Sequence, residues 1–247
     1  MIIIILDVLQ KQNYKYFQVL VILIVFMKMM VMDMLSTNEW KRPIYFAVTI
    51  GNDYHLGLDP YLELTGLAYR ITPERSANGR HRVNTEVMYD NMLHKFKYGN
   101  MNVPGIYIDE NTMRMCRTHR MMFMELAEAL YNEGKHDKCL EVLDFAEEML
   151  PGYNISYDYT SATMAAYYYQ LGEIEKANAI MTKVADNSVE YMAWGASLPK
   201  EQRASSQSTL QQQLAILGYV LQNFERYQQK ELFNLYYDLY VQYASVR

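Results

Sequence analysis

The stretch RMMFMELAEALYNEGKHDKCLEVLDFAEEMLP, residues 120–151, decides the fold of this chain. Its apolar residues at positions 123, 126, 127 and 130 recur with the period of one helix face. Gly134 permits a tight turn after them, because glycine adopts a positive φ without a steric penalty. The small residues Cys139 and Ala146 let a second helix approach the first closely. The sequence therefore predicts two antiparallel helices joined at Gly134.

Position by position, this stretch resembles a tetratricopeptide repeat, a helix-turn-helix unit of about 34 residues. A second unit follows in YYYQLGEIEKANAIMTKV, residues 167–184, with its turn at Gly172. A third helix pair over residues 208–244 has the same period, but Glu225 stands where a turn glycine is expected. Because such units need neighbours to bury their faces, we expect a mainly α fold with an antiparallel helical array over 109–247.

Composition supports a mainly helical protein and excludes several classes of function. The 247 residues include only 11 glycines and 6 prolines, too few for a turn-rich all-β fold. The net charge of −5 means that the chain has no excess of basic residues to bind nucleic-acid phosphates, so we expect no nucleic-acid partner. Two cysteines cannot form a disulfide framework or a four-thiolate zinc site. We predict no metal site and no cofactor.

Residues 1–35 differ from the rest of the chain because nearly all of them are apolar. The run FQVLVILIVFM, residues 17–27, is shorter than the roughly 20 residues that span a bilayer. The run reaches about 20 residues only if the flanking residues on both sides are included in the helix. We predict a membrane-associated helix over 17–35, with a buried or disordered chain end or a cleaved signal peptide as the alternatives.

Residues 36–108 predict a small α+β module between the apolar segment and the array. We expect strands at 44–50 and 67–71, each bounded by turn residues, and a helical turn over 61–66. A short amphipathic helix is expected over 87–96. Asp109 then suits the N-cap of the long first helix of the array.

Four segments carry a more specific resemblance over residues 29–247: MLSTNEWKRPIYFAVTIG, YLELTGLAYRI, MYDNMLHKFKYG and YIDENTMRM. In this order they resemble the C-terminal soluble region of a family of large bacterial membrane proteins related to protein O-mannosyltransferases. That family combines a multi-span glycosyltransferase-like region with a tail of tetratricopeptide-like helices. The 247 residues contain no such multi-span region, so by this resemblance the chain looks like a truncated gene product, a late-start product or a separate remnant. The resemblance implies membrane association with the soluble part in the periplasm, with a soluble cytoplasmic fragment as the alternative.

The chain offers no pattern typical of a catalytic centre. G-x-S-x-G and H-E-x-x-H are absent, and the carboxylate pairs are adjacent in sequence, so they diverge around a helix. We therefore predict no catalytic residues and a noncatalytic protein-interaction or scaffold module. The alternative is an accessory acceptor- or glycan-binding part of a protein O-glycosylation system.

Two candidate sites follow from these hypotheses. By resemblance, the first helix of each repeat lines a concave groove for a protein or peptide partner, or a glycan, through Met121, Met124, Glu128, Tyr131, Asn132, Tyr159, Tyr169 and Gln170. Methionine and tyrosine at helical spacing also suit simple packing. A second set combines aromatic and basic residues for an anion or glycan: Trp40, Arg42, Tyr45, Arg70, Arg114 and Arg117. The last two recur with Arg120 every three residues, and a solvated face is the alternative reading.

Overall fold

The computed structural model describes residues 25–26 and 29–245. The chain divides into two compact units, which are described separately. Unit 1 runs to Leu64 and includes 68–82; unit 2 comprises 65–67 and everything from Val83 onward. As predicted, the fold is mainly helical with a small sheet near the N-terminus.

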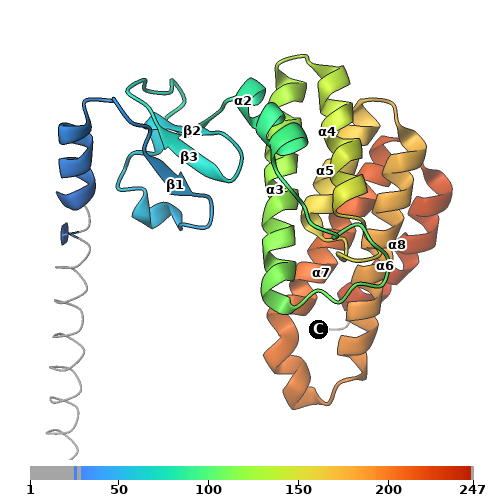
Figure 1. Ribbon diagram of the computed structural model, residues 1–247. Helices are drawn as coiled ribbons and strands as arrows, with labels where there is room; N and C mark the ends of the chain where they lie inside the picture. The colour runs from blue at the N-terminus through green and yellow to red at the C-terminus, as the bar shows by residue number, and fades with distance from the viewer. Residues whose placement is uncertain (1–24, 27–28, 246–247) are drawn as a thin grey trace, which may run out of the picture. The chain divides into compact units, whose positions relative to one another are not determined.

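Unit 2 is dominated by three antiparallel helix pairs (Figure 1). Consecutive helices pack against each other, and the first helices of successive pairs also touch, α3 with α5 and α5 with α7. This is the contact pattern of stacked helix pairs. The helices are α3(Glu110–Asn132), α4(His136–Met149), α5(Tyr159–Gln170), α6(Ile174–Ser197), α7(Lys200–Arg226) and α8(Lys230–Ser245).

The predicted apolar face of α3 forms the core of the first pair. Phe123, Leu126, Ala127 and Leu130 have no exposed surface. The Sγ of Cys139 lies 3.3 Å from the carbonyl oxygen of Ala127, so the two helices approach as closely as the small residues allow. At the start of α3, the Asp109 side chain accepts from the backbone N–H of residues 111 and 112, which confirms the predicted N-cap.

The turns between paired helices share one geometry. Gly134 and Gly172 have φ of 74° and 86°, which confirms both predicted turn glycines. In the third pair the sequence placed the turn residue at Glu225, and this prediction is wrong. The residue with positive φ in that turn is Gln228, at 59°. The N–H of Gln228 donates to the Glu225 carbonyl, as that of Gly134 does to Tyr131. Glutamine thus occupies a left-handed position that favours glycine.

We expect Gln228→Gly to raise the free energy of unfolding by about 0.5 kcal/mol, because relief of left-handed strain outweighs the added freedom of the unfolded chain. The reverse substitution, Gly134→Gln, is the matched control and should lower it by about 1 kcal/mol. Urea denaturation measures both. A lower midpoint for Gln228→Gly would contradict this account of the turn.

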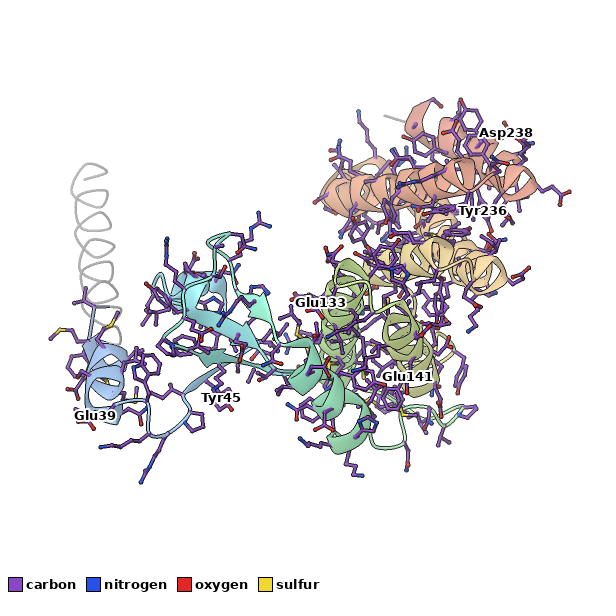
Figure 2. The ribbon with its side chains drawn as sticks, turned by 90° about the horizontal axis from the view of Figure 1, so that it is seen from above. Glu39, Tyr45, Glu133, Glu141, Tyr236 and Asp238 are labelled. Atoms are coloured by element: carbon purple, nitrogen blue, oxygen red, sulfur yellow. The ribbon has the colours of Figure 1, made fainter. Side chains whose placement is uncertain are left out.

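The short helix α2(Thr85–Asp90) belongs to unit 2. Its Thr85 hydroxyl donates to the Glu133 carboxylate at 2.8 Å, and the Tyr89 hydroxyl donates to Glu141. Figure 2 labels both glutamates on the first helix pair, beside α2. The chain therefore divides near residue 82, whereas the sequence placed a boundary at 108/109. The helix predicted over 87–96 consists of α2 and the π-helical turn η3(Asn91–Lys95).

Unit 1 contains a four-stranded sheet in the order β1-β3-β2-β4, with β4 at the junction with unit 2. The strands are β1(Tyr45–Ala47), β2(Leu62–Leu64), β3(Ala68–Ile71) and β4(Arg82–Val83). The helical turn expected over 61–66 is corrected: a 3-10 turn ends at Tyr61 and strand β2 follows. The reason is alternation, because Leu62 and Leu64 are buried and Glu63 points to the other face.

The apolar segment 1–35 falls largely outside the described residues, and so does most of the membrane-associated helix predicted over 17–35. Residues 29–38 are helical. Of the helices formed by the described residues, none is long and apolar enough to cross a membrane.

Candidate ligand-binding cleft

A cleft of about 850 Å³ lies at the N-terminal end of α5 in unit 2. Its origin is a mismatch of helix lengths. Helix α5 has 12 residues, whereas α6 has 24 and α7 has 27, so the ends of α6 and α7 extend beyond the other helices (Figure 1). Residues 156–160 form one part of the lining, and side chains of α3, α6 and α7 form the rest.

Three half-exposed aromatic side chains line the cleft. Tyr159, Tyr191 and Trp194 are 52%, 50% and 48% exposed. The rings of Tyr191 and Trp194 stand perpendicular, with centroids 6.4 Å apart, and the Tyr159 ring lies 5.3 Å from that of Tyr219. Large apolar surfaces gathered in a concave site are typical of ligand-binding pockets.

Amide and carboxylate groups complete the polar lining. The buried Ser188 hydroxyl donates to Oε1 of Gln213 at 3.1 Å, and Nδ2 of Asn187 donates to the Tyr157 carbonyl at 3.1 Å. Asp158 accepts from the backbone and hydroxyl of Ser161 in a capping box that begins α5. These bonds fix the side chains around the cleft in defined orientations.

A buried arginine holds the loop that leads into the cleft. Arg120 is 1% exposed, and its guanidinium donates at 2.9 Å to three backbone carbonyls, those of Leu150, Ile155 and Ser156. It also lies 5.4 Å from the centre of the Tyr157 ring. Burial lowers the pKa of Arg120, but a guanidinium remains charged in proteins. Both interpretations of the arginine stripe, an anion site and a solvated face, are therefore wrong at Arg120, because its side chain is buried in the core.

Glu147 lies next to this arginine and accepts a hydrogen bond from the Tyr157 hydroxyl at 2.6 Å. Burial raises the pKa of the Glu147 carboxyl, and the Tyr157 hydrogen bond and the Arg120 charge offset only part of that rise. Burial also raises the pKa of Tyr157. The loop before α5 is therefore hydrogen-bonded, through Tyr157, to a carboxyl that is partly removed from water.

This geometry predicts a pH dependence of stability. Because folding raises the pKa of this carboxyl, its protonation stabilises the folded state, and the full stabilisation is present at pH values below the ordinary pKa of 4.5. The stabilisation is lost as the pH rises through the raised pKa. We expect Glu147→Gln, which keeps an acceptor for Tyr157, to lose less stability than the wild type between pH 5 and pH 8. Urea midpoints measure this, with the exposed neighbour changed in Glu148→Gln as control. Parallel pH profiles for Glu147→Gln and the wild type would contradict it.

The structure brings together two residues from the two predicted sets, Arg117 of α3 and Tyr159 of α5. Tyr191, Trp194 and Gln213 are absent from those sets. The first two stand three residues apart on one helix, and this spacing is a signal of a shared face.

The other predicted groove residues lie outside the cleft. Met121, Glu128, Asn132 and Gln170 are exposed, whereas Met124 is half-buried. The half-buried Tyr131 stacks on His136 with ring centroids 4.8 Å apart.

Tyr169 is a packing residue. It is 3% exposed, its ring stacks on Tyr227 at 4.4 Å, and its hydroxyl donates to Asn178. The alternative interpretation of the predicted groove residues, simple packing, therefore holds for Tyr169. Its side chain has almost no accessible surface that a partner could contact.

In unit 1, Trp40, Arg42, Tyr45 and Arg70 are exposed. Tyr45, labelled in Figure 2, faces Arg70 across the antiparallel β1/β3 pair, so these two side chains share one face of the sheet. Arg114 lies on α3 in unit 2, where its guanidinium donates to Asn111 at 2.9 Å.

Comparison with known proteins finds a match for the N-terminal third of the chain. Residues 6–87 match the family model described as TMEM260-associated domain 2. The TMEM260 family is related to protein O-mannosyltransferases, in agreement with the resemblance over this region. The match ends within α2 and does not reach the cleft. No curated protein and no solved structure gives a significant match.

Proposed function

We propose that this chain is a noncatalytic binding module with a tetratricopeptide-like array that holds a protein or peptide partner in the cleft at the start of α5. The observation that carries the proposal is the set of half-exposed aromatic side chains, Tyr159, Tyr191 and Trp194, within one concave site. Arrays of helix pairs present extended concave surfaces of this kind to their partners.

The polar groups of the cleft support binding over catalysis. Asp158 is engaged in capping α5, and Ser188 is engaged with Gln213. Both therefore maintain the shape of the site. Amide side chains next to aromatic surfaces suit an extended peptide, since they bond its backbone while the rings contact its side chains.

A second candidate function is an accessory role in protein O-glycosylation, with a glycan or glycosylated acceptor as the ligand. The match of residues 6–87 to TMEM260-associated domain 2 favours it. The contact residues would then be the exposed Trp40, Tyr45 and Arg70 of unit 1.

We also propose that residues 17–35 attach the chain to a membrane, with the soluble part in the periplasm. The apolar run 17–27 supports this proposal. Retention of the full chain in the membrane pellet after carbonate extraction is the expected result. Complete release into the supernatant would contradict it.

Selection from a displayed random peptide library tests the binding proposal directly. We expect peptides that bind the full chain and lose about tenfold or more in affinity with Trp194→Ala, a loss of about 1.4 kcal/mol. Trp40→Ala is the matched control, because Trp40 is a similarly exposed tryptophan in unit 1. Failure to enrich peptides, or affinities insensitive to Trp194→Ala, would contradict the proposal. Glycan binding lost in Trp40→Ala would instead support the second candidate.

A further inference from the structure

One face of α6 brings two aromatic rings and a carboxylate together in the cleft. Glu190, Tyr191 and Trp194 all line it, and their spacing of three and four residues places them side by side on the helix surface. The ring planes of Tyr191 and Trp194 are perpendicular, so their half-exposed faces are turned in two directions. Glu190 stands one helical turn before Trp194, which makes its carboxylate a neighbour of the indole.

The charges of the cleft lining do not cancel. Among the lining residues that the structure describes, Glu190 and Asp158 are acidic and Arg117 is basic, which leaves one negative charge. Asp158 and Arg117 offset one another in this sum, so the remaining charge is that of Glu190. Its exposed carboxylate forms no hydrogen bond or ion pair with any other described residue. An unpaired negative charge therefore lies on the face of α6 that carries the two rings.

We propose that the cleft binds an arginine side chain of the partner peptide, an inference that rests on the proposed function. A guanidinium stacks on aromatic ring faces, because the negative face of the ring attracts a cation. Its planar edge can at the same time donate two parallel hydrogen bonds to a carboxylate. Tyr191 and Trp194 supply the ring faces, and Glu190 supplies the carboxylate.

The free acceptors of the lining suit a group that only donates. Besides Glu190, the side-chain oxygens of Thr160 and Gln212 accept no hydrogen bond from any residue that the structure describes. A guanidinium carries five N–H donors and no acceptor. A lysine ammonium is a compact, strongly hydrated charge without a plane to stack. We therefore expect arginine to bind more tightly than lysine.

A neutral sugar differs from arginine in its charge. Its hydroxyl groups donate and accept, so they too would bond to the free amides and hydroxyls of the lining. Those hydrogen bonds do not depend on a net charge in the ligand. A cation gains Coulomb attraction to the Glu190 carboxylate in addition, and this attraction weakens as salt is added. The unpaired carboxylate beside the rings is the observation that favours arginine.

Fluorescence anisotropy on the full chain tests the inference with labelled peptides that share a glycine-serine sequence and differ at one central residue, which is arginine, citrulline or lysine. Citrulline keeps the planar shape of arginine but carries no charge. We expect the arginine peptide to bind about tenfold more tightly than the citrulline peptide, with the lysine peptide between them. Added salt should reduce the difference between arginine and citrulline.

Variants of the cleft assign this preference to its residues. Glu190→Gln keeps the shape of the side chain and removes its charge, so the preference for arginine over citrulline should fall to about twofold or less. Glu175→Gln is the matched control, because it makes the same charge change at an exposed site on α6 outside the cleft. It should leave the preference unchanged. Trp194→Phe, which keeps a ring face, should retain more of the arginine affinity than Trp194→Leu.

Equal affinity for the arginine and citrulline peptides would overturn the inference, and so would a preference for arginine that persists in Glu190→Gln. Mannotriose that binds through Trp194 while the arginine peptide does not bind would overturn it too, by assigning the cleft to a sugar. These outcomes differ from failure of the proposed function. Library peptides that bind through Trp194 but contain no arginine would refute this inference and leave the proposed function standing.

Discussion

Arg120→Met should lower the free energy of unfolding by about 3–5 kcal/mol, the largest effect we expect from a single substitution in this chain. Methionine fills much of the space but cannot donate, so it leaves the Leu150, Ile155 and Ser156 carbonyls without their partner. The loop that leads into the cleft loses its anchor. Urea denaturation at pH 7 measures the change.

Arg117→Met is the matched control, because it removes the same charge from an exposed position one turn earlier on α3. Its effect should stay within about 0.5 kcal/mol, as for most surface substitutions. A loss of less than about 1 kcal/mol in Arg120→Met would show that the three carbonyls find other partners, and it would contradict the anchoring role.

Tyr169→Ala should cost about 3 kcal/mol or more and leave peptide binding unchanged. The side chain is 3% exposed and stacks on Tyr227, so its removal opens a cavity between α5 and the turn after α7. Tyr159→Ala is the matched tyrosine on the same helix. Because Tyr159 is 52% exposed in the cleft, its loss should cost less than about 1 kcal/mol and weaken peptide binding.

Thermal melts and anisotropy titrations of both variants separate the two roles. The opposite pattern, with Tyr169→Ala folded normally but unable to bind, would place the ligand in the groove predicted from the repeat pattern. It would contradict the assignment of the cleft.

The helical array could be predicted from the sequence because its signals are local. The apolar period around Phe123, the turn glycines at 134 and 172 and the N-cap at Asp109 each depend on a few neighbouring residues. The turn at Gln228 could not be predicted, because a glutamine with positive φ has no sequence signature. Strand β2 was ambiguous for a similar reason, since a short apolar run fits a helical turn or a strand.

The candidate site was only partly predictable because it depends on packing between distant segments. Arg120 and Arg117 have the same local pattern, yet the first is buried and the second lines the cleft. Their difference depends on where the loop at 150–156 folds back. The cleft itself arises because α6 and α7 are longer than α5, and no single motif records that difference in length.

Fluorine NMR of the full chain labelled with 5-fluorotryptophan tests the central claim most directly, because the chain contains only two tryptophans, Trp40 and Trp194. Trp40→Phe assigns the two resonances. On titration with a peptide recovered from the library, the Trp194 resonance should shift saturably while that of Trp40 stays in place, since Trp194 lines the cleft and Trp40 lies in unit 1. A saturable shift at Trp40 with none at Trp194 would contradict binding in the cleft.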